Sequence, residues 1–364
     1  MPFYLIIMIE LGCTQILITG ANGWLGKNLV EYLMQGDSDN KDIQISNNIR
    51  KIRCFVLPNE DISFLRNFSE RIEIEIITGD LRNPDDCLTF TSNAKGAILF
   101  HTAGVIHPNR VKDFYEINVT GISNLLDAAV INKVRRIVVV SSNSPCGTNP
   151  HPDHIFDEDS PYRPYLNYGC SKMKMELVVK DRYNHGDIET VIIRPPWFYG
   201  PYQPARQTLF FKMIRDGKAP IVGGGENLRS MAYVLNICQG AILAAMHENA
   251  NGETYWIADE RPYTMNEIIN TVEKLLEEEF GQECAHKRLK LPGFVSDAAF
   301  LMDTVLQGMG LYHQKIHVLS EMNKTIVCSI KKANKELGYN PTVSLEEGML
   351  RSLKWWFEDN RERE

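Results

Sequence analysis

The chain has 364 residues, and its content of 44% hydrophobic and 23% charged residues is typical of a globular protein. A formal net charge of −7 argues against nucleic acid as a partner, because sequence-independent binding needs a basic surface. No apolar run approaches the ~20 residues of a membrane span, and residues 3–9 make a poor signal peptide. The eight cysteines are scattered singly, which favours thiols in the cytoplasm over disulfides or a metal site.

Two kinds of segment alternate from residue 15 onward. Short apolar, β-branched runs predict six strands, at residues 16–19, 52–57, 72–77, 97–100, 137–140 and 190–193. Helical patterns between them include residues 25–34, 114–132 and 171–183, and the polar residues 36–48 predict a surface loop. Continuous apolar strands separated by helices indicate a parallel sheet covered on both faces. Residues 14–200 are therefore predicted to form an α/β, doubly wound domain.

The character of the chain changes after residue 194. Prolines and a glycine-rich turn at residues 223–225 interrupt it, and helical segments follow. These helices are predicted at residues 236–247, 265–279 and 294–309, and a final segment runs through residues 331–337 and 345–357. We assign residues 201–364 to a smaller, mostly helical substrate-binding lobe, from which some late segments return to the core.

A glycine-rich turn joins the first predicted strand to the first helix. It reads Thr19-Gly20-Ala21-Asn22-Gly23-Trp24-Leu25-Gly26. Gly20 permits a tight turn, Gly23 lets a diphosphate approach the backbone, and Gly26 lets the helix pack close to the strand. Free N–H groups at a helix start favour an anion. The turn predicts a Rossmann-type dinucleotide site, against the alternative of a plain structural turn, and its cofactor-binding residues would be Gly20, Asn22, Gly23, Trp24, Leu25 and Gly26.

The end of the second strand bears on the choice of cofactor, because a residue there holds the adenosine ribose. Residues 57–59 (Leu-Pro-Asn) offer neither a carboxylate for NAD nor an arginine for NADP. Glu60 and Asp61 come slightly late and are alternatively caps of the next helix. We expect NAD, since the arginine is missing, and leave NADP open.

Tyr168 and Lys172 stand four residues apart in a helical pattern, so their side chains share a face. A nearby cation lowers the pKa of a phenol, which lets the phenol exchange a proton with a substrate hydroxyl. Ser141 and Ser142 follow the fifth strand, at the sheet edge where ligands bind, and a serine there can hydrogen-bond the reacting oxygen. The alternatives are an exposed helical pair and a serine that caps a turn.

Taken together, these motifs resemble the extended short-chain dehydrogenase/reductase family, also called the NAD-dependent epimerase/dehydratase family. The matching residues run from Thr19 to about Trp355. After the glycine-rich turn they are Gly79-Asp80, His101-Thr102-Ala103-Gly104, Asn118-Val119-Thr120-Gly121, Ser141-Ser142, Tyr168-x-x-x-Lys172, Arg194-Pro195 and Tyr199-Gly200-Pro201.

The resemblance implies roles for individual residues. Tyr168 would be the general acid/base, Ser142 would orient the substrate oxygen, and Lys172 would hold the nicotinamide ribose and tune the phenol. The other implied cofactor contacts are Asp80 at the adenine, with Leu81, Ala103, Gly104 and Arg194 along the cleft. The implied substrate contacts are Asn118, Ser142, Asn143, Trp197 and Arg229. A homodimer formed through residues 114–132 and 168–183 is also implied.

Plainer interpretations remain open for four of the motif residues. Asp80 could cap a helix, Asn118 could make an internal helix contact, and Arg229 could be a solvated loop arginine. His101, which we do not expect to be catalytic, could be a satisfied strand-end histidine.

Departures from the family pattern bear on the substrate. Sugar-nucleotide 4,6-dehydratases carry Thr-Asp-Glu where this chain has Ser142-Asn143-Ser144, so elimination of water lacks its acid and base and we do not expect it. Trp197 stands where many nucleotide-sugar members have an asparagine. With an aromatic residue there, the chain is closer to the hydroxysteroid-dehydrogenase-like members. Arg229 instead matches an arginine that grips the diphosphate of a sugar nucleotide in epimerases.

Three hypotheses about function follow. The first is an NAD(P)-dependent epimerase or dehydrogenase/reductase that acts at a secondary alcohol carbon of a small-molecule substrate, a nucleotide-linked sugar. The second is the same chemistry on an apolar, hydroxysteroid-like or polyketide-like alcohol, which residues 294–311 would cover unless they form a packed helix. The third is a non-catalytic, cofactor-sensing protein, which would have no need of Ser142, Tyr168 and Lys172.

Overall fold

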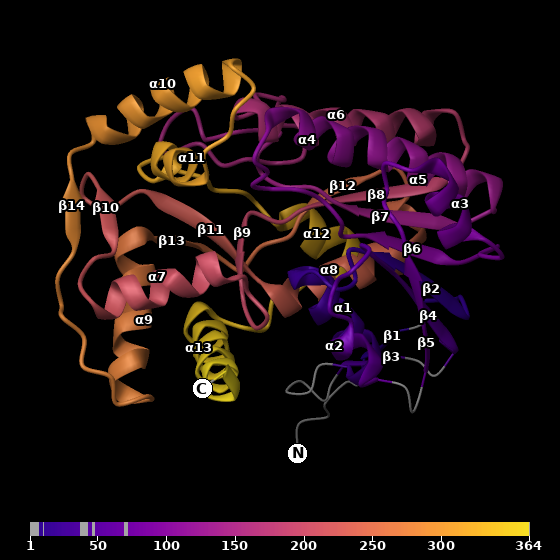
Figure 1. The fold of residues 1–364 in the computed structure, drawn as a ribbon, viewed down its shortest axis with the longest axis horizontal. Coiled ribbons are helices and arrows are strands. Elements are labelled where there is room, and N and C mark those ends of the chain that lie inside the picture. Colours follow the sequence, from indigo (N-terminus) through magenta and orange to yellow (C-terminus); the bar gives the residue numbers. More distant parts are fainter. Residues whose placement is uncertain (1–6, 10, 37–42, 46–47, 69–71, 364) are drawn as a thin grey trace.

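A parallel sheet of seven strands forms the centre of the protein (Figure 1). The structure is a computed structural model, and it describes residues 7–9, 11–36, 43–45, 48–68 and 72–363. The strand order is β12 (Thr254–Trp256), β8 (Glu189–Arg194), β7 (Arg136–Val140), β6 (Ile98–His101), β2 (Gln15–Thr19), β4 (Lys51–Val56) and β5 (Glu73–Thr78). The predicted doubly wound, Rossmann-type α/β fold is confirmed, with the six predicted strands in place and β12 added at one edge.

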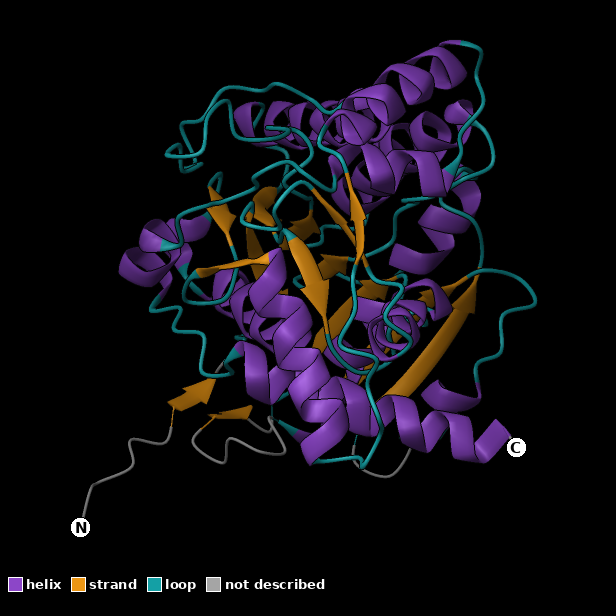
Figure 2. Ribbon diagram, turned by 90° about the vertical axis from the view of Figure 1, so that its left-hand side faces the viewer, coloured by secondary structure: helices purple, strands orange, loops and turns teal. Residues whose placement is uncertain are grey.

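Helices cover both faces of this sheet, so the strands lie between helical layers in Figure 2. One face packs against α1 (Trp24–Gln35) and α8 (Val234–Met246), the other against α3 (Pro84–Thr91), α5 (Gly121–Ile131) and α6 (Leu166–Asn184). Successive residues of a strand point to opposite faces. Ile16 and Ile18 accordingly belong to the first of these two hydrophobic cores, and Leu17 to the second.

The predicted helix at residues 114–132 is interrupted in the structure. It consists of α4 (Val111–Tyr115), a π-helical turn, η1 (Glu116–Thr120), and α5. Single π-helical turns inside helices frequently occur at functional sites. This one carries Asn118, which lies near the residues predicted to be catalytic.

A mostly helical part follows residue 200, as predicted. Its strands are β10 (Pro220–Val222), β11 (Leu228–Tyr233), β13 (Pro262–Thr264) and β14 (Leu289–Leu291), and β9 (Trp197–Tyr199), just before residue 200, pairs with β11. Its helices are α7 (Ala205–Arg215), η2 (Glu248–Ala250), α9 (Met265–Glu278), α10 (Phe294–Gly308), α11 (Gln314–Glu321), α12 (Lys331–Leu337) and α13 (Leu345–Arg363). Helix α8 and strand β12 come from this second part of the chain, but they complete the layers of the central sheet. The chain therefore returns to the central sheet after residue 200. A domain boundary at that residue stays a prediction.

The segment predicted to be a surface loop, residues 36–48, contains a short strand. Residues 43–45 form β3 (Ile43–Ile45), which pairs with β1 (Ile7–Ile9). Helix α2 (Ser63–Arg66) follows β4. Residues 37–42 and 46–47 of that segment lie outside the described part, as do residues 1–6.

All eight cysteines are free thiols. None of the described helices is both long and apolar enough to cross a bilayer, and the described side chains form no cluster suited to a metal ion.

Candidate active site

The glycine-rich turn after β2 needs its glycines for steric reasons. Gly20 has φ of +65°, and a Cβ atom there would lie 2.8 Å from the Cα atom of Ala103. A Cβ atom on Gly26 would lie 2.0 Å from the carbonyl oxygen of Gly20. Both contacts are far below van der Waals distance, so the turn packs against the segment after β6, and α1 against the turn, only with glycine at these positions.

The start of α1 is suited to an anion. Gly23 is its N-cap residue, no side chain caps the helix, and its first turn holds no acidic residue. The Oδ1 atom of Asn22 is buried with no partner among the described residues, while its Nδ2 donates to the Asp61 carbonyl. Free N–H groups and the helix dipole favour negative charge at such a position. These residues fit the diphosphate of a dinucleotide.

Two further residues of the turn brace α1. The indole Nε1 of Trp24 donates to the Pro201 carbonyl at 2.8 Å, and Leu25 is buried in the core. The segment that follows β9 is thereby tied to the phosphate-binding turn. This contact brings the second half of the chain to the cofactor side of the sheet.

The residues after β4 are occupied locally. The side chain of Asp61 accepts a hydrogen bond from the backbone N–H of Ser63 at the start of α2, and Glu60 accepts one from the backbone N–H of Leu57. Hydrogen bonding to Ser63 lowers the pKa of Asp61. The capping interpretation of Asp61 is therefore the one that the structure shows.

The residues predicted to line the rest of the cofactor cleft follow β5 and β6. Arg82 donates to both carboxylate oxygens of Asp80 and holds the pKa of Asp80 below its ordinary value. Leu81 is buried against Gly121 of α5. A Cβ atom on Gly104 would lie 3.5 Å from Nζ of Lys172, so the glycine keeps the backbone close to that amine. An adenine contact by Asp80 stays a prediction.

Ser142 and Tyr168 meet at the carboxyl end of β7. Ser142 follows the strand by two residues, and Tyr168 lies in the first turn of α6; both are buried. Burial raises the pKa of Tyr168 to about 12, and a hydrogen bond with Ser142 opposes part of that rise. The phenol is therefore protonated at neutral pH and hydrogen-bonded to the hydroxyl that was predicted to orient the substrate.

Lys172 lies one turn further along the same face of α6. Its Nζ atom donates to the Val140 carbonyl at 2.9 Å, and burial lowers its pKa to about 8, against the opposing charge of Glu176. Lys172 is not among the groups that shift the pKa of Tyr168 in this structure, so tuning of the phenol by this lysine stays a prediction. The cation that lowers the pKa of Tyr168 is Arg206 of α7, and its effect is smaller than that of burial.

His101, at the end of β6, is a satisfied strand-end histidine. Its Nδ1 shares a 2.8 Å hydrogen bond with the hydroxyl of Thr19, and the ring is buried. Burial, together with the charge of Lys172, lowers the pKa of His101 to about 3, so the ring is neutral. The structure therefore gives His101 a packing role.

A third residue continues the stripe formed by Tyr168 and Lys172. Glu176 lies four residues after Lys172, is fully buried, and accepts hydrogen bonds from Ser141 at 2.5 Å and Tyr162 at 2.7 Å. The sequence analysis missed Glu176. Its place at four-residue spacing after the pair was the available signal, because residues i, i+4 and i+8 share a helix face.

Arg194, which was predicted to contact the cofactor, is the main partner of Glu176. Its Nη2 and Nε atoms donate to the two carboxylate oxygens at 2.6 and 3.0 Å, and its guanidinium packs against the rings of Tyr162 and Trp256. The side chain is almost wholly enclosed, and its Nη1 has no partner among the described residues. Arg194 therefore fixes α6 to β8, and a contact with the cofactor stays a prediction. We call Ser141, Tyr162, Glu176 and Arg194 the Glu176 network.

Asn118 also differs from its predicted role as a substrate contact. Its Oδ1 accepts from the Val105 N–H at 2.9 Å, and its Nδ2 donates to the Val105 carbonyl and to Ser171 at 3.1 Å each. The side chain is buried, so the structure shows the internal helix contact that was the alternative. Asn143, by contrast, is half-buried beside Ser142, whose hydroxyl donates to its Oδ1 at 3.3 Å.

Two residues of the C-terminal part were predicted to contact substrate. Trp197, in β9, is half-buried and packs against Phe210 of α7. Arg229, in β11, is buried rather than solvated; its Nη2 donates to the Glu321 carbonyl, and its Nε has no partner among the described residues. No described carboxylate forms an ion pair with Arg229, although the charge of Glu321 acts on it.

Aromatic residues enclose the phenol of Tyr168. Phe114 of α4 and Tyr312, in the loop between α10 and α11, form one buried cluster with it. The hydroxyl of Tyr312 lies 2.6 Å from Nδ1 of His107, which joins that loop to the segment after β6. The wall of the site beside the phenol is therefore apolar and comes from both halves of the chain.

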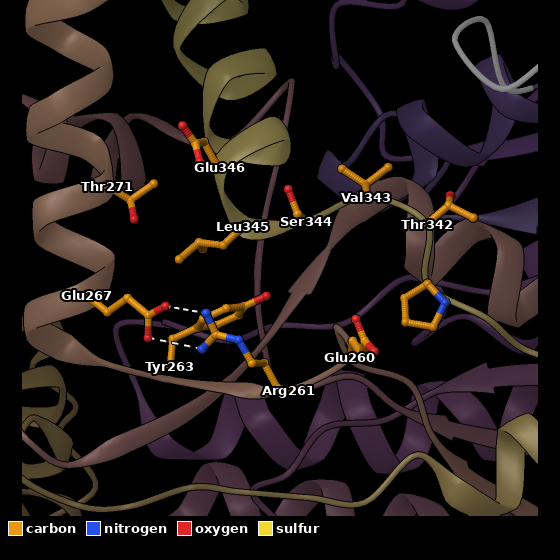
Figure 3. Close-up of a pocket in the computed structure, with 11 residues that line it drawn as sticks. Glu260, Arg261, Tyr263, Glu267, Thr271, Thr342, Val343, Ser344, Leu345 and Glu346 are labelled. Atoms are coloured by element: carbon orange, nitrogen blue, oxygen red, sulfur yellow. Dashed lines mark hydrogen bonds and ion pairs between the residues drawn. The ribbon is translucent and has the colours of Figure 1, made fainter.

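A surface hollow of about 280 Å³ lies elsewhere, between β13, α9 and the residues before α13 (Figure 3). Arg261 faces Glu267 across it, with Nη1 donating to Oε2 at 3.1 Å. None of its lining residues belongs to the ends of β2, β6 or β7, to α1 or to α6. We therefore place the active site at the strand ends and not in this hollow.

Comparison with known proteins agrees with this fold. Residues 16–258 match the NAD dependent epimerase/dehydratase family, and the chain belongs to that family. Its cofactor is accordingly NAD, which the uncapped start of α1 fits.

Relatives of known sequence span several activities. The chain is 51% identical to the uncharacterized protein y4nL of Sinorhizobium fredii (strain NBRC 101917 / NGR234), over 95% of this chain and 96% of that protein. It is 27% identical to 3beta-hydroxysteroid-dehydrogenase/decarboxylase isoform 1 of Arabidopsis thaliana, over 92% and 78%. A segment covering 45% of the chain is 34% identical to 49% of an Escherichia coli O157:H7 protein, N-acetyl-alpha-D-glucosaminyl-diphospho-ditrans,octacis-undecaprenol 4-epimerase.

Solved structures share the fold across two reaction types. The dTDP-glucose 4,6-dehydratase DesIV of Streptomyces venezuelae is similar with a TM-score of 0.72 at 23% identity, covering 95% of this chain and 98% of that one. The UDP-glucose 4-epimerase of Thermotoga maritima is similar with a TM-score of 0.72 at 17% identity, covering 95% and 99%.

Proposed function

We propose that this protein is an NAD-dependent enzyme that oxidises or reduces a secondary alcohol carbon, with a nucleotide-linked sugar as its substrate. The observation that carries the proposal is the meeting of the Ser142 hydroxyl, the Tyr168 phenol and the Lys172 amine at the carboxyl end of β7. A sensor of the cofactor would need none of the three, and an enzyme of this kind needs all of them.

The proposed roles follow from what each side chain can donate or accept. NAD, when bound, supplies the hydride acceptor or donor. Tyr168 takes a proton from the substrate hydroxyl or returns one to the carbonyl oxygen, and Ser142 holds that oxygen in place by hydrogen bonding. Lys172 is charged at neutral pH and holds the nicotinamide ribose. The aromatic wall around Tyr168 keeps water from the reacting atoms.

Arg229 supports a substrate that carries a diphosphate. A buried guanidinium with an unpaired Nε and no carboxylate partner is unfavourable unless an anion satisfies it. The charge of Tyr165, three residues before Tyr168, acts on Arg229, so both lie on the same side of the site. The relative from Escherichia coli and the Thermotoga maritima structure, by their names, act on diphosphate-linked sugars.

Within this family we propose epimerisation or net oxidoreduction, and not 4,6-dehydration. The fold does not separate these reactions, since a 4,6-dehydratase and a 4-epimerase share it. Residues 142–144 carry no carboxyl group, and elimination of water needs an acid and a base beside Tyr168. Incubation with dTDP-glucose tests this point, and formation of a 4-keto-6-deoxy sugar would contradict it.

A second candidate substrate is an apolar alcohol. The aromatic cluster formed by Phe114, Tyr168 and Tyr312 favours it, because an apolar ring system would pack against these side chains. The relative from Arabidopsis thaliana is named a hydroxysteroid dehydrogenase. Oxidation of a 3β-hydroxysteroid with no turnover of UDP-sugars would select this alternative.

The Tyr168→Phe variant tests the catalytic assignment. Removing the phenol hydroxyl should lower turnover by about 10²- to 10⁴-fold, because the proton loses its donor and acceptor, while NAD binding stays close to wild type. Turnover is measured with UDP-glucose, UDP-N-acetylglucosamine and a 3β-hydroxysteroid, and NAD binding by calorimetry. Tyr183→Phe, at the far end of α6, is the matched control and should keep full turnover. Equal turnover in Tyr168→Phe would refute the assignment.

We also propose that the protein is located in the cytoplasm. We further propose that it forms a homodimer through α4, η1, α5 and α6. Ile131 of α5 and Leu177 and Tyr183 of α6 are exposed, which supports a partner on these helices. The mass of the protein in solution, with and without Leu177→Glu, tests the dimer.

A further inference from the structure

Helix α10 is amphipathic in the reverse sense of an ordinary surface helix. Its buried residues are Ser296, Ala299, Asp303 and Gln307, which follow helical spacing and are mostly polar. Its exposed side includes Phe294 at 69% and Leu301 at 67% exposure, together with Met302 and Val305. A surface helix normally buries its apolar stripe and exposes its polar one. Here the apolar side faces outward.

Hydrogen bonds fix this orientation. Asp303 is fully buried, and its two oxygens lie 2.7 Å from Nδ1 of His317 and 2.9 Å from Nε2 of Gln307. The Oε1 atom of Gln307 accepts from the backbone N–H of Asn167 in α6, and Ser296 donates to the Leu319 carbonyl. Turning α10 over would leave these buried polar groups without partners. The outward apolar face is therefore built into the fold.

The apolar face continues beyond α10. Met309 and Leu311 in the following loop and Val318 of α11 are exposed as well. In Figure 1, α10 lies at the outer margin of the molecule, with α11 beside it. We use the term apolar face for a set of exposed side chains, namely those of Phe294, Leu301, Met302, Val305, Met309, Leu311 and Val318. Contiguous exposed apolar surface of this kind marks an interaction site.

Charges near the apolar face are of one sign. Lys287 and Lys290 precede α10, Lys315 follows Leu311 in the first turn of α11, and all three are exposed, with no ion pair among the described residues. The one exposed acid of residues 287–318, Asp297, is neutralised by Lys324 at 2.8 Å. In a chain of net charge −7, this region carries unpaired positive charge at both ends of an apolar stripe.

We propose that the apolar face docks on the surface of an anionic lipid bilayer. Apolar side chains of an amphipathic helix enter the boundary between headgroups and acyl chains, and lysines at its ends are attracted to anionic headgroups. Two copies of the chain in contact through this face would bring the same lysines together. The contact is peripheral, and it does not depend on which reaction the enzyme performs.

The docked orientation would bring the active site to the membrane. Tyr312, next to Leu311, packs against Phe114, which in turn packs against Tyr168. The loop that ends the apolar face is thus also part of the wall beside the phenol. An amphiphilic substrate held in a bilayer would reach the site along this wall.

Flotation of the full-length protein with vesicles tests the proposal. We expect binding to vesicles of phosphatidylcholine with phosphatidylglycerol, and weaker binding to phosphatidylcholine alone. The triple variant Leu301→Gln/Met302→Gln/Val305→Gln should weaken binding at least tenfold, because it removes apolar side chains that enter the bilayer. The matched control is Ile155→Gln, which replaces a similarly exposed apolar residue elsewhere and should bind as wild type does.

A charge variant separates the contribution of the lysines to vesicle binding from that of the apolar side chains. Lys287→Glu/Lys290→Glu/Lys315→Glu should lose most of the preference for anionic vesicles. Absence of binding by the wild-type protein, or equal binding by the wild type and the triple glutamine variant, would overturn the proposal. A dimer in solution that the same glutamine substitutions dissociate would also overturn it, since a second copy would then cover the face. Thermal unfolding of each variant confirms that the fold is intact.

Discussion

Arg194 and Arg229 are both buried arginines, with 1% and 7% of their surface exposed, but their surroundings differ. Arg194 meets both oxygens of Glu176 and two aromatic rings. Arg229 donates to one backbone carbonyl and has no carboxylate partner among the described residues. Within the described part of the chain, each guanidinium leaves one buried nitrogen without a hydrogen bond, Nη1 of Arg194 and Nε of Arg229, so the paired carboxylate is what separates the two arginines.

The difference lies in how completely each charge is compensated. The carboxylate of Glu176 is hydrogen-bonded by Ser141, Tyr162 and Arg194, and these contacts hold its pKa below the ordinary value although burial alone would raise it. Such a closed set of partners fixes α6, and with it Tyr168 and Lys172, against β7 and β8. Arg229 lacks such a carboxylate, which is why we propose it as the residue that binds an anionic substrate.

Replacing Arg194 should have the largest effect on stability. Arg194→Met leaves the buried carboxylate of Glu176 without its cation, so we expect the free energy of unfolding to fall by about 3–5 kcal/mol. Denaturant unfolding measures it. Lys274→Ala, which breaks an exposed pair with Glu346, is the control and should cost much less stability than Arg194→Met. Equal losses in both variants would show that the Glu176 network is not a buried ion pair.

The double variant sharpens that result. In Arg194→Met/Glu176→Leu the buried carboxylate is removed together with its cation, so part of the lost stability should return. Turnover should nevertheless stay below wild type, because α6 loses the contacts that position Tyr168. Recovery of stability together with full turnover would limit the Glu176 network to a role in folding.

Replacing Arg229 should leave stability unchanged or raise it slightly, since the variant Arg229→Met removes a buried cation that lacks an ion-pair partner. Binding of UDP, measured by calorimetry, should weaken by about 1–3 kcal/mol, the range for a lost charged hydrogen bond. NAD binding should not change. Arg215→Met, at the end of α7, is the control and should bind UDP as wild type does. Unchanged UDP binding in Arg229→Met would favour the apolar-alcohol substrate.

The smallest expected effect is the dependence of kcat/KM on pH. The folded-state pKa of Lys172 is about 8, below its ordinary value of 10.5, with burial as the main cause and Glu176 opposing it. The amine is charged below this pH, so kcat/KM should fall by up to about tenfold per pH unit above it. Between pH 8 and 10.5 the unfolded chain binds the proton that folded Lys172 releases, so the cost of burying this amine decreases and stability rises with pH through that range.

A matched variant identifies the titrating group. In Lys172→Arg the guanidinium does not titrate in this range, so the decline above about pH 8 should disappear even if turnover is lower throughout. His101, which also faces Lys172, is neutral across the range and does not contribute. The same decline in Lys172→Arg would assign it to another group.

Local patterns predicted the strands and the glycine-rich turn, because these depend on neighbours in the sequence. Alternating burial along β2 and the steric demands of Gly20 and Gly26 are properties of a few consecutive residues. The same patterns did not predict β12, which is three residues long and joins the sheet beside β8 only after the chain has left it and returned. Nor did they predict the π-helical turn that carries Asn118.

By itself the sequence determined the sheet, the dinucleotide turn and the shared face of Tyr168 and Lys172, since periodicity and spacing encode them directly. Only the tertiary structure decided which polar residues meet a partner within the protein. Arg194 and Asn118 find partners far away in the chain, Arg229 finds no carboxylate among the described residues, and α10 turns its apolar side outward. The free energy of a buried polar group depends on every group around it, and those neighbours come together only when the chain folds.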